Sequence, residues 1–325
     1  MNEASCFPVL SIIIVTWNGK RYALECLESL YAHPLEVPIE IIVVDNASTD
    51  GTPDAIRAQF PDVHVVGNQA NLGFAKANNI GVALSRGKYV CLINSDVVVF
   101  PGCLDRMLAL MQTNQDVGII GPKMICPDGS VGRSVMRLPT VWNTLCAAVA
   151  LNSIFPTSRL FAGFSVRSDA IANVKDVQVV GGWFWMVSRT ALQQVGGLDE
   201  RFFMFGEDID WCHRFREAGW RVVFCGEAEA LHYGGASSAD APARSYVEMR
   251  RANLQYFKKY HGTLGAVGYT LAIGIHELAR IAGYSLSFCY DRNRRLEAGS
   301  KVRRSLSCLR WLVGGGSWVA RQSGE

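Results

Sequence analysis

The sequence lacks the features that mark several common protein classes. No stretch reaches eighteen consecutive apolar residues, so we expect no membrane-spanning helix. No Gly-x-Gly-x-x-Gly follows an apolar run, which argues against a dinucleotide oxidoreductase. The ten cysteines include no Cys-x-x-Cys pair and lie in apolar or helical patterns, as buried thiols do in a reducing compartment. The first residues carry Glu3 and no basic start, so we expect no signal peptide and a cytoplasmic location.

Charge is present but unevenly distributed. Residues 1–240 hold 18 Lys and Arg against 24 Asp and Glu, and residues 241–325 hold the other 14 against 5. The formal net charge of +3 therefore combines −6 in the first part with +9 in the second. A basic end on an acidic body indicates an anionic surface such as lipid as a partner. No nucleic-acid-binding motif accompanies the charge, so we expect no nucleic acid.

Apolar runs alternate with amphipathic stretches in the first half of the chain. The runs cover residues 10–15, 39–44, 63–66 and 88–94, and the helical stretches cover 20–32, 52–60, 75–85 and 101–111. Continuous apolar strands that alternate with helices predict an α/β fold with a mostly parallel sheet covered on both faces.

The pattern after residue 118 is less regular. We expect strands at 118–124, 176–188 and 221–225, a helix at 207–218, and helices from Ser245 onward, and we place no element in 138–161. The chain therefore divides into a body, residues 1–240, and a basic amphipathic helical region, residues 241–325.

Polar side chains follow three of the expected strands. Thr16-Trp17-Asn18 follows the first strand, Asp45-Asn46 the second, and Asn94-Ser95-Asp96 the strand at 88–94. At the carboxyl edge of a parallel sheet these residues would face the crevice where ligands bind. Asp45 could accept hydrogen bonds from a base or ribose, and Asp96 is an oxygen ligand suited to a hard cation. Turn formation is the alternative for both acids, and for Asp50 we favour an N-cap.

Glycine, aromatic and acidic residues form further candidate sites. Gly73 opens a helix whose amides suit a phosphate or a sugar hydroxyl, with a plain cap as the alternative. Gly181-Gly182-Trp183 would let the chain approach a ligand and stack on a sugar, with a bulge and core packing as the alternative. Glu207 and Asp208 would lie in the first turn of a helix beside an aromatic run, where a general base is well placed. Stabilisation of the helix dipole is the alternative there, and Asp210 points elsewhere.

We expect His232 to close a further strand after the one at 221–225. Gly234-Gly235-Ala236-Ser237 follows and suggests a loop over a site. His232 could bind a metal beside Asp96 or donate to a phosphate, although a single histidine is more often structural.

These motifs, in this order, resemble the inverting family 2 glycosyltransferases with a GT-A-type fold, and most closely the bacterial rhamnosyltransferase-like enzymes of cell-surface polysaccharide synthesis. The matching stretches are SIIIVTWNGK, IIVVDNASTDGT, NLGFAKANNIG, LINSDVVV, GGWFWMVSR, FFMFGEDIDWCHRFREAGW and HYGG. The resemblance implies nucleotide-sugar binding in residues 1–100, an acceptor and base region in 120–240, and a C-terminal helical region.

The resemblance also implies a role for each matching residue. Asp208 would be the catalytic base and Glu207 would help to hold the acceptor. Asp96 and His232 would bind Mg²⁺ or Mn²⁺ at the donor diphosphate. Asn94 departs from the common Asp of the family and is a weaker, neutral ligand. The donor site would contain Thr16, Asn18, Asp45, Asn46, Gly73, Asn94, Ser95 and Asp96, and the acceptor site Gly181, Gly182, Trp183 and Asp210.

The expected reaction moves a sugar, with rhamnose favoured by the resemblance, from a nucleotide diphosphate to a hydroxyl of a saccharide or lipid-linked acceptor with inversion. A nucleotidyltransferase and a catalytically inactive membrane-associated scaffold of the same fold are the alternatives. Residues 241–325 fit a peripheral attachment to the inner face of the plasma membrane, or else an ordinary helical subdomain with a solvated basic face.

Overall fold

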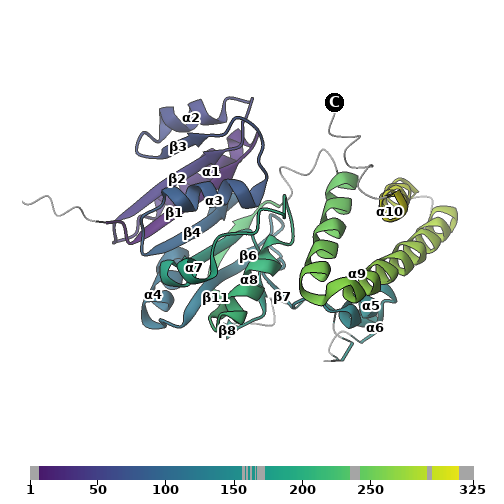
Figure 1. Cartoon of the computed structure of the whole chain (residues 1–325). Coiled ribbons are helices and arrows are strands. Elements are labelled where there is room, and N and C mark those ends of the chain that lie inside the picture. The colour runs from purple at the N-terminus through teal and green to yellow at the C-terminus, as the bar shows by residue number, and fades with distance from the viewer. Residues whose placement is uncertain are drawn as a thin grey trace, which may run out of the picture. The chain divides into compact units, whose positions relative to one another are not determined.

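The computed structural model describes residues 7–155, 158, 160–161, 163–164, 166, 173–234, 242–290 and 295–314. The chain forms two compact units (Figure 1). The first unit contains residues 1–137 and 166–237, and the second contains residues 138–165 and 238–325. The segment 138–165 therefore groups with the C-terminal helices and not with the acceptor region in which we had placed it.

A nine-stranded sheet in the order β3-β2-β1-β4-β10-β6-β11-β5, with β8 beside β11, is the centre of the first unit. The first four strands are parallel, β10 lies antiparallel between β4 and β6, and β6 and β11 are again parallel. The expected mostly parallel sheet is confirmed. Its strands are β1 (Leu10–Thr16), β2 (Ile39–Asp45), β3 (His64–Gly67), β4 (Tyr89–Asn94), β5 (Val97–Val99), β6 (Val117–Ile125), β8 (Val174–Asp176), β10 (Phe184–Ser188) and β11 (Arg221–His232), and a separate pair joins β7 (Val135–Met136) to β9 (Val179–Val180).

Helices cover both faces of this sheet. Ile12 and Ile14 of β1 belong to the core cluster that contains Leu27 of α1, and Ile42 of β2 packs in the cluster of Ala77 from α3. Side chains that alternate between the two faces explain why the parallel strands are apolar throughout. The helices are α1 (Lys20–Ala32), α2 (Thr52–Gln59), α3 (Phe74–Leu84), α4 (Cys103–Thr113), α7 (Arg189–Val195) and α8 (Glu207–Glu217).

Two strand predictions were wrong. The single strand expected at 176–188 is divided among β8, β9 and β10, because the chain leaves β7 at Gly181 and joins β4 at Phe184. The strand expected to end at Cys225 continues to His232 after a shift of register between Cys225 and Glu229. Glutamates interrupt the apolar pattern where this irregularity lies, so the sequence pattern ended too early.

The second unit is helical, with α5 (Val141–Ala148), α6 (Leu151–Ile154), α9 (Pro242–Tyr290) and α10 (Arg295–Gly314). Thr140 and Asn143 form a reciprocal capping box at the start of α5. Gly262 has φ of 64° and ψ of −163°, so α9 consists of two helical arms. Within the described residues, no helix combines the length and apolarity needed to cross a membrane.

Candidate active site

The carboxyl ends of β1 and β2 place Thr16 beside Asp45, which are partners in the strand register. Both residues are almost fully buried. Asp45 Oδ2 accepts a hydrogen bond from the Ser48 amide at 2.9 Å, whereas Asp45 Oδ1 and Thr16 Oγ1 have no hydrogen-bond partner. Buried polar atoms are normally paired, so these two oxygens mark a place for a ligand or water.

Asn18 and Asn46 hold the loops around this point. The Asn18 amide donates to Ser48 Oγ, and Asn18 Oδ1 accepts from the Thr49 amide, each at 2.8 Å. Asn46 Nδ2 donates to the carbonyl of Gly73 at 3.2 Å, and Asn46 Oδ1 accepts from Asn68 Nδ2 at 2.9 Å. Asn46 is 3% exposed, so the structure uses its side chain to join β2 to the start of α3.

Asp50 stabilises the starts of two helices at once. Its carboxylate accepts from the Lys20 amide of α1 at 3.0 Å and from the Thr52 amide of α2 at 3.1 Å. Partial burial opposes ionisation, but the hydrogen bonds from Thr52 and Lys20 outweigh it and lower the pKa of Asp50. The N-cap of α2 is Gly51, so Asp50 does not occupy the N-cap position that we expected, although its role is structural.

Gly73 serves the packing of a loop. Its φ is 82°, and a Cβ atom there would lie 2.6 Å from the carbonyl oxygen of Phe203. The Phe74 amide donates to that oxygen at 2.8 Å. The first amide of α3 is therefore already bonded. We had expected this amide to be free for a phosphate or a sugar hydroxyl.

Asp96 and His232, the two predicted metal ligands, lie together. Antiparallel pairing of β5 with β11 sets Val97 opposite His232. His232 Nε2 lies 3.1 Å from Asp96 Oδ1 and 3.4 Å from Asn94 Nδ2. The indole ring of Trp183 stacks on the imidazole with a centroid distance of 5.4 Å and an interplanar angle of 16°.

This pair suits a divalent cation only as part of a larger ligand set. A carboxylate oxygen and an imidazole nitrogen are acceptable to Mn²⁺, and Asn94 Oδ1 is a buried oxygen without a partner. The described part of the chain contains no group of three or more His, Cys, Asp and Glu side chains that could hold a metal. Diphosphate oxygens and water would have to supply the other ligands.

Ser95 lies close to the end of β1. A Cβ atom on Gly19 would be 3.7 Å from Thr16 Oγ1 and 4.0 Å from Ser95 Oγ. The hydroxyl groups of Ser95 and Thr16 thus approach the same point of the backbone.

Glu207 and Asp208 begin α8, after Gly206 at φ 81°. Burial raises the pKa of Asp208 to about 6, although amide hydrogen bonds from Ile209 and Gly182 favour its charged form. Burial and, second, the negative charge of Asp208 raise the pKa of Glu207 to about 8. Glu207 therefore keeps its proton to a higher pH than Asp208 does.

Gly182 and Trp183 connect the two groups of acids. The backbone amide of Asn94 donates a hydrogen bond to the Trp183 carbonyl at 2.9 Å. A Cβ atom on Gly182 would lie 3.1 Å from Asp208 Cβ. Since Trp183 also stacks on His232, one turn contacts both His232 and Asp208. Asp96 and Asp208 thus lie at the same edge of the sheet.

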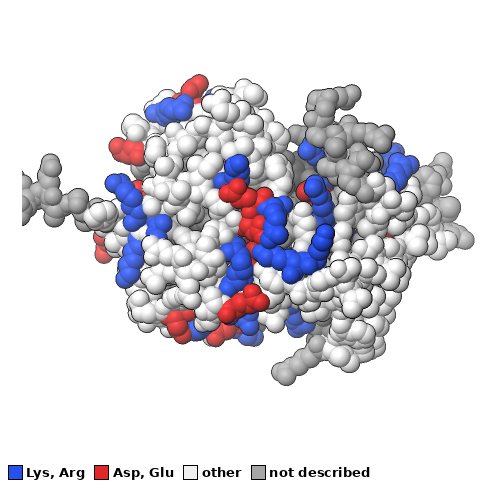
Figure 2. All heavy atoms as spheres, in the orientation of Figure 1, with Lys and Arg blue, Asp and Glu red and all other residues white. Residues whose placement is uncertain are grey.

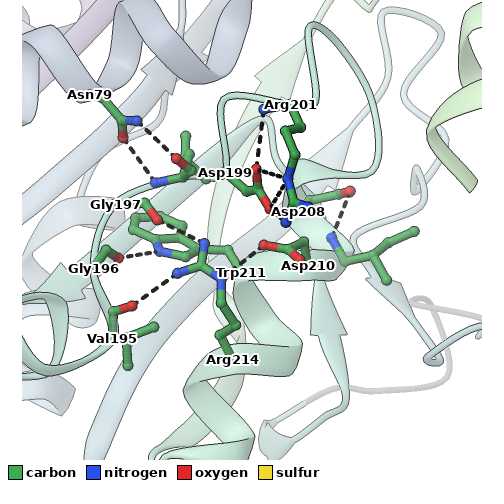
Figure 3. Close-up of polar contacts among 12 residues, drawn as sticks. Asn79, Val195, Gly196, Gly197, Asp199, Arg201, Asp208, Asp210, Trp211 and Arg214 are labelled. Atoms are coloured by element: carbon green, nitrogen blue, oxygen red, sulfur yellow. Dashed lines mark hydrogen bonds and ion pairs between the residues drawn. The ribbon is translucent and has the colours of Figure 1, made fainter. Parts of the chain in front are cut away.

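Three residues predicted to bind the acceptor have structural contacts instead. Asp210 is fully buried and accepts from Arg214 Nε at 2.8 Å, while the same guanidinium donates to the carbonyls of Val195 and Gly197 (Figure 3). Trp183 is 4% exposed, so its ring is not available to stack on a sugar. Gly181 is also buried, and its amide donates to the Ser134 carbonyl at 2.9 Å.

Sequence reasoning missed Phe203 and Tyr233. Phe203 is 43% exposed and lies against Gly73, on the loop that leads into α8. The sequence feature that could have identified Phe203 is the aromatic run directly before Glu207. Tyr233 Oη donates to Glu25 Oε1 at 2.6 Å. This hydrogen bond joins the residue after His232 to α1. Residues 235–237, part of the loop expected over the site, are outside the described residues.

The mixed, mostly parallel sheet with helices on both faces, and with acids and a histidine at one edge, is a fold of the GT-A type. The solved structure of a mannosyltransferase from Pyrobaculum calidifontis, in complex with GDP-Man and Mn²⁺, has the same fold, with a TM-score of 0.55 at 17% identity over 94% of this chain and 87% of that chain.

Sequence comparison gives the family. Residues 11–171 match the model of Glycosyl transferase family 2. An N-acetylglucosaminyl-diphospho-decaprenol L-rhamnosyltransferase of Mycobacterium tuberculosis is 32% identical over 247 residues, which cover 72% of this chain and 79% of that protein. The low-salt glycan biosynthesis hexosyltransferase Agl10 of Haloferax volcanii is 26% identical over 227 residues, 69% of this chain and 66% of that protein. The chain belongs to glycosyl transferase family 2.

Proposed function

We propose that this glycosyltransferase moves rhamnose from a nucleotide diphosphate to a hydroxyl of a lipid-linked saccharide, with inversion. One observation carries the proposal. The turn Gly182-Trp183 contacts the Asp96–His232 pair through Trp183 and the Asp208 carboxyl group through Gly182. The activity of the mycobacterial relative, an N-acetylglucosaminyl-diphospho-decaprenol L-rhamnosyltransferase, supports rhamnose and a diphospholipid-linked acceptor.

The donor would bind at the ends of β1, β2 and β4. Thr16 Oγ1 and Asp45 Oδ1 would bond to the nucleoside, since both lack a partner among the residues that the structure describes. Asp96 and His232 would hold Mg²⁺ or Mn²⁺ near the diphosphate. When bound, the cation would offset the charge that develops on the leaving diphosphate.

Asp208 would act as the general base. Its ionised carboxylate would take the proton of the acceptor hydroxyl while amides of Gly182 and Ile209 keep it oriented. The acceptor oxygen would attack the anomeric carbon from the face opposite the diphosphate, so one displacement inverts the centre. Glu207, protonated at neutral pH, would donate a hydrogen bond to the acceptor.

Purified full-length protein, incubated with a deoxythymidine diphosphate-rhamnose donor and an N-acetylglucosaminyl diphospho-polyprenol, tests the proposal. We expect release of nucleoside diphosphate and a rhamnosylated lipid with Mg²⁺ or Mn²⁺, and loss of turnover with EDTA. In a separate incubation with a nucleoside triphosphate and a sugar 1-phosphate, release of pyrophosphate would favour a nucleotidyltransferase. Absence of both products with a panel of nucleotide sugars would favour an inactive scaffold.

The proposed location is the inner face of the plasma membrane, where a lipid-linked acceptor is held. The +9 balance of residues 241–325 supports this location, because anionic lipids attract clustered Lys and Arg.

A further inference from the structure

The second arm of α9 exposes a continuous row of large aliphatic side chains. Between 48% and 87% of each side chain is exposed, so none of them belongs to the core of the second unit. A buried face of the same arm, which includes Tyr269, Ala272 and Ile273, supplies that core. The exposed row consists of Leu264, Val267, Leu271, Ile275, Leu278 and Leu286.

No charge interrupts this row. From Gly262 to Leu286 the only acidic or basic side chains besides His276 are Glu277, which is fully buried, and Arg280, whose side chain is 25% exposed. Figure 2 shows the visible surface over this arm in white, without Lys, Arg, Asp or Glu. An uncharged apolar strip of this length on a protein surface marks an interaction site.

The row follows one side of the arm. From Leu264 to Leu278 its members lie three or four residues apart, as on one face of a helix. Leu264, Leu271 and Leu278 are also seven residues apart, a spacing that a coiled coil with a second copy would use. A second copy is therefore the competing occupant of this face, and the oligomeric state distinguishes it from a membrane.

We infer that the outward face of α9 from Leu264 to Leu286 docks on an anionic phospholipid bilayer, with the helix lying in the plane of the interface. Apolar side chains would enter the boundary between head groups and acyl chains, as in interfacial amphipathic helices. The surplus of basic residues in 241–325 supplies the complementary charge. The choice of a membrane as partner rests on the proposed lipid-linked acceptor.

Flotation of the full-length protein with vesicles of phosphatidylcholine and phosphatidylglycerol tests this inference, with Leu271→Glu as the variant. Leu84→Glu is the matched control, because Leu84 is 42% exposed at the end of α3 in the first unit. We expect Leu271→Glu to reduce the membrane partition coefficient, obtained from the vesicle-bound fraction at several lipid concentrations, at least about tenfold, since a buried leucine contributes at least that factor. Leu84→Glu should float like the wild type.

Several outcomes would overturn the inference. These are wild-type protein that fails to float, equal flotation of Leu271→Glu and wild type, or a wild-type dimer that becomes a monomer on Leu271→Glu without vesicles. Circular dichroism checks that the variants fold, and Leu264→Glu, at an 87% exposed position, replaces Leu271→Glu if that variant does not fold. The assay contains no donor, so flotation can succeed while the proposed transfer reaction fails, and the reverse.

Discussion

At the scale of single residues, the two acids at the start of α8 titrate in different ranges. The pKa of Asp208 is raised to about 6 and that of Glu207 to about 8, in both cases chiefly by burial. We expect kcat/KM to fall about tenfold per pH unit below 6, where the base is protonated, and to fall again above 8, where Glu207 loses its proton. Glu207→Gln should remove only the alkaline limb, because glutamine still donates. A flat pH–rate profile between pH 5 and 7 would contradict the assignment of Asp208.

Replacement of Asp208 separates chemistry from binding. Asp208→Asn keeps the size of the side chain but cannot accept the proton, so we expect kcat to fall by about 10²-fold or more. The Kd of the donor, measured by calorimetry, should change by less than about twofold, since Asp208 does not lie among the donor residues. Loss of donor binding in this variant would argue against a base.

Asn94 sets the charge beside Asp96. Its Oδ1 atom is buried and unpartnered, and its Nδ2 atom lies 3.4 Å from His232 Nε2. We expect Asn94→Asp to strengthen Mn²⁺ binding about tenfold, because a carboxylate is a stronger ligand than an amide for a hard cation. Titration followed by electron paramagnetic resonance measures the Kd, and Asp105→Asn in α4 is a control away from the site. Unchanged affinity would place the cation elsewhere.

At the scale of elements, the start of α3 depends on a glycine. Gly73 combines a φ of 82° with the close approach of Phe203. We expect Gly73→Ala to lower the free energy of unfolding by roughly 1–3 kcal/mol, because alanine is strained at this φ and its Cβ would displace the loop before α8. Gly67→Ala is the matched control, since no atom lies within 4 Å of a Cβ there. Equal urea midpoints for the two variants would contradict this account.

Elements with a regular hydrophobic period were predictable, and those held by distant pairing were not. Apart from the short strand β5, which we did not expect, the strands and helices from Leu10 to Thr113 follow the expected order, because each has a continuous apolar run or an amphipathic face. The insertion of β10 between β4 and β6 could not be predicted, since no local pattern in Phe184–Ser188 reports an antiparallel neighbour. The bulge in β11 was hidden for the same reason.

At the scale of the whole molecule, part of the site follows from strand ends alone. Parallel pairing of β1 with β2 brings Thr16 to Asp45, as the sequence order predicts. The burial of Trp183 depends on His232, which is far from it in the sequence and not marked by any local pattern. Asp210 pairs with Arg214 four residues later, a spacing that the sequence contains, but its complete burial depends on the fold. The sequence could therefore identify the acids near the site, but it could not show which residues act in the reaction and which only stabilise the fold.

The raised pKa values also make stability depend on pH. The folded chain holds protons on Glu207 and Asp208 up to about pH 8 and 6, whereas unfolding returns these pKa values to 4.5 and 3.8. Their contribution is complete below these unfolded values and is lost as pH rises through the folded ones. Glu207→Gln removes one such group, so the wild type should lose more stability than the variant between pH 5 and pH 8. The variant's free energy of unfolding, taken relative to the wild type, should therefore rise by at least about 1 kcal/mol from pH 5 to pH 8, since one pKa unit corresponds to about 1.4 kcal/mol. Urea unfolding at both pH values measures this difference, with Glu36→Gln at an exposed position as control. If Glu207→Gln and Glu36→Gln change stability equally at both pH values, Glu207 is not held protonated in the folded protein.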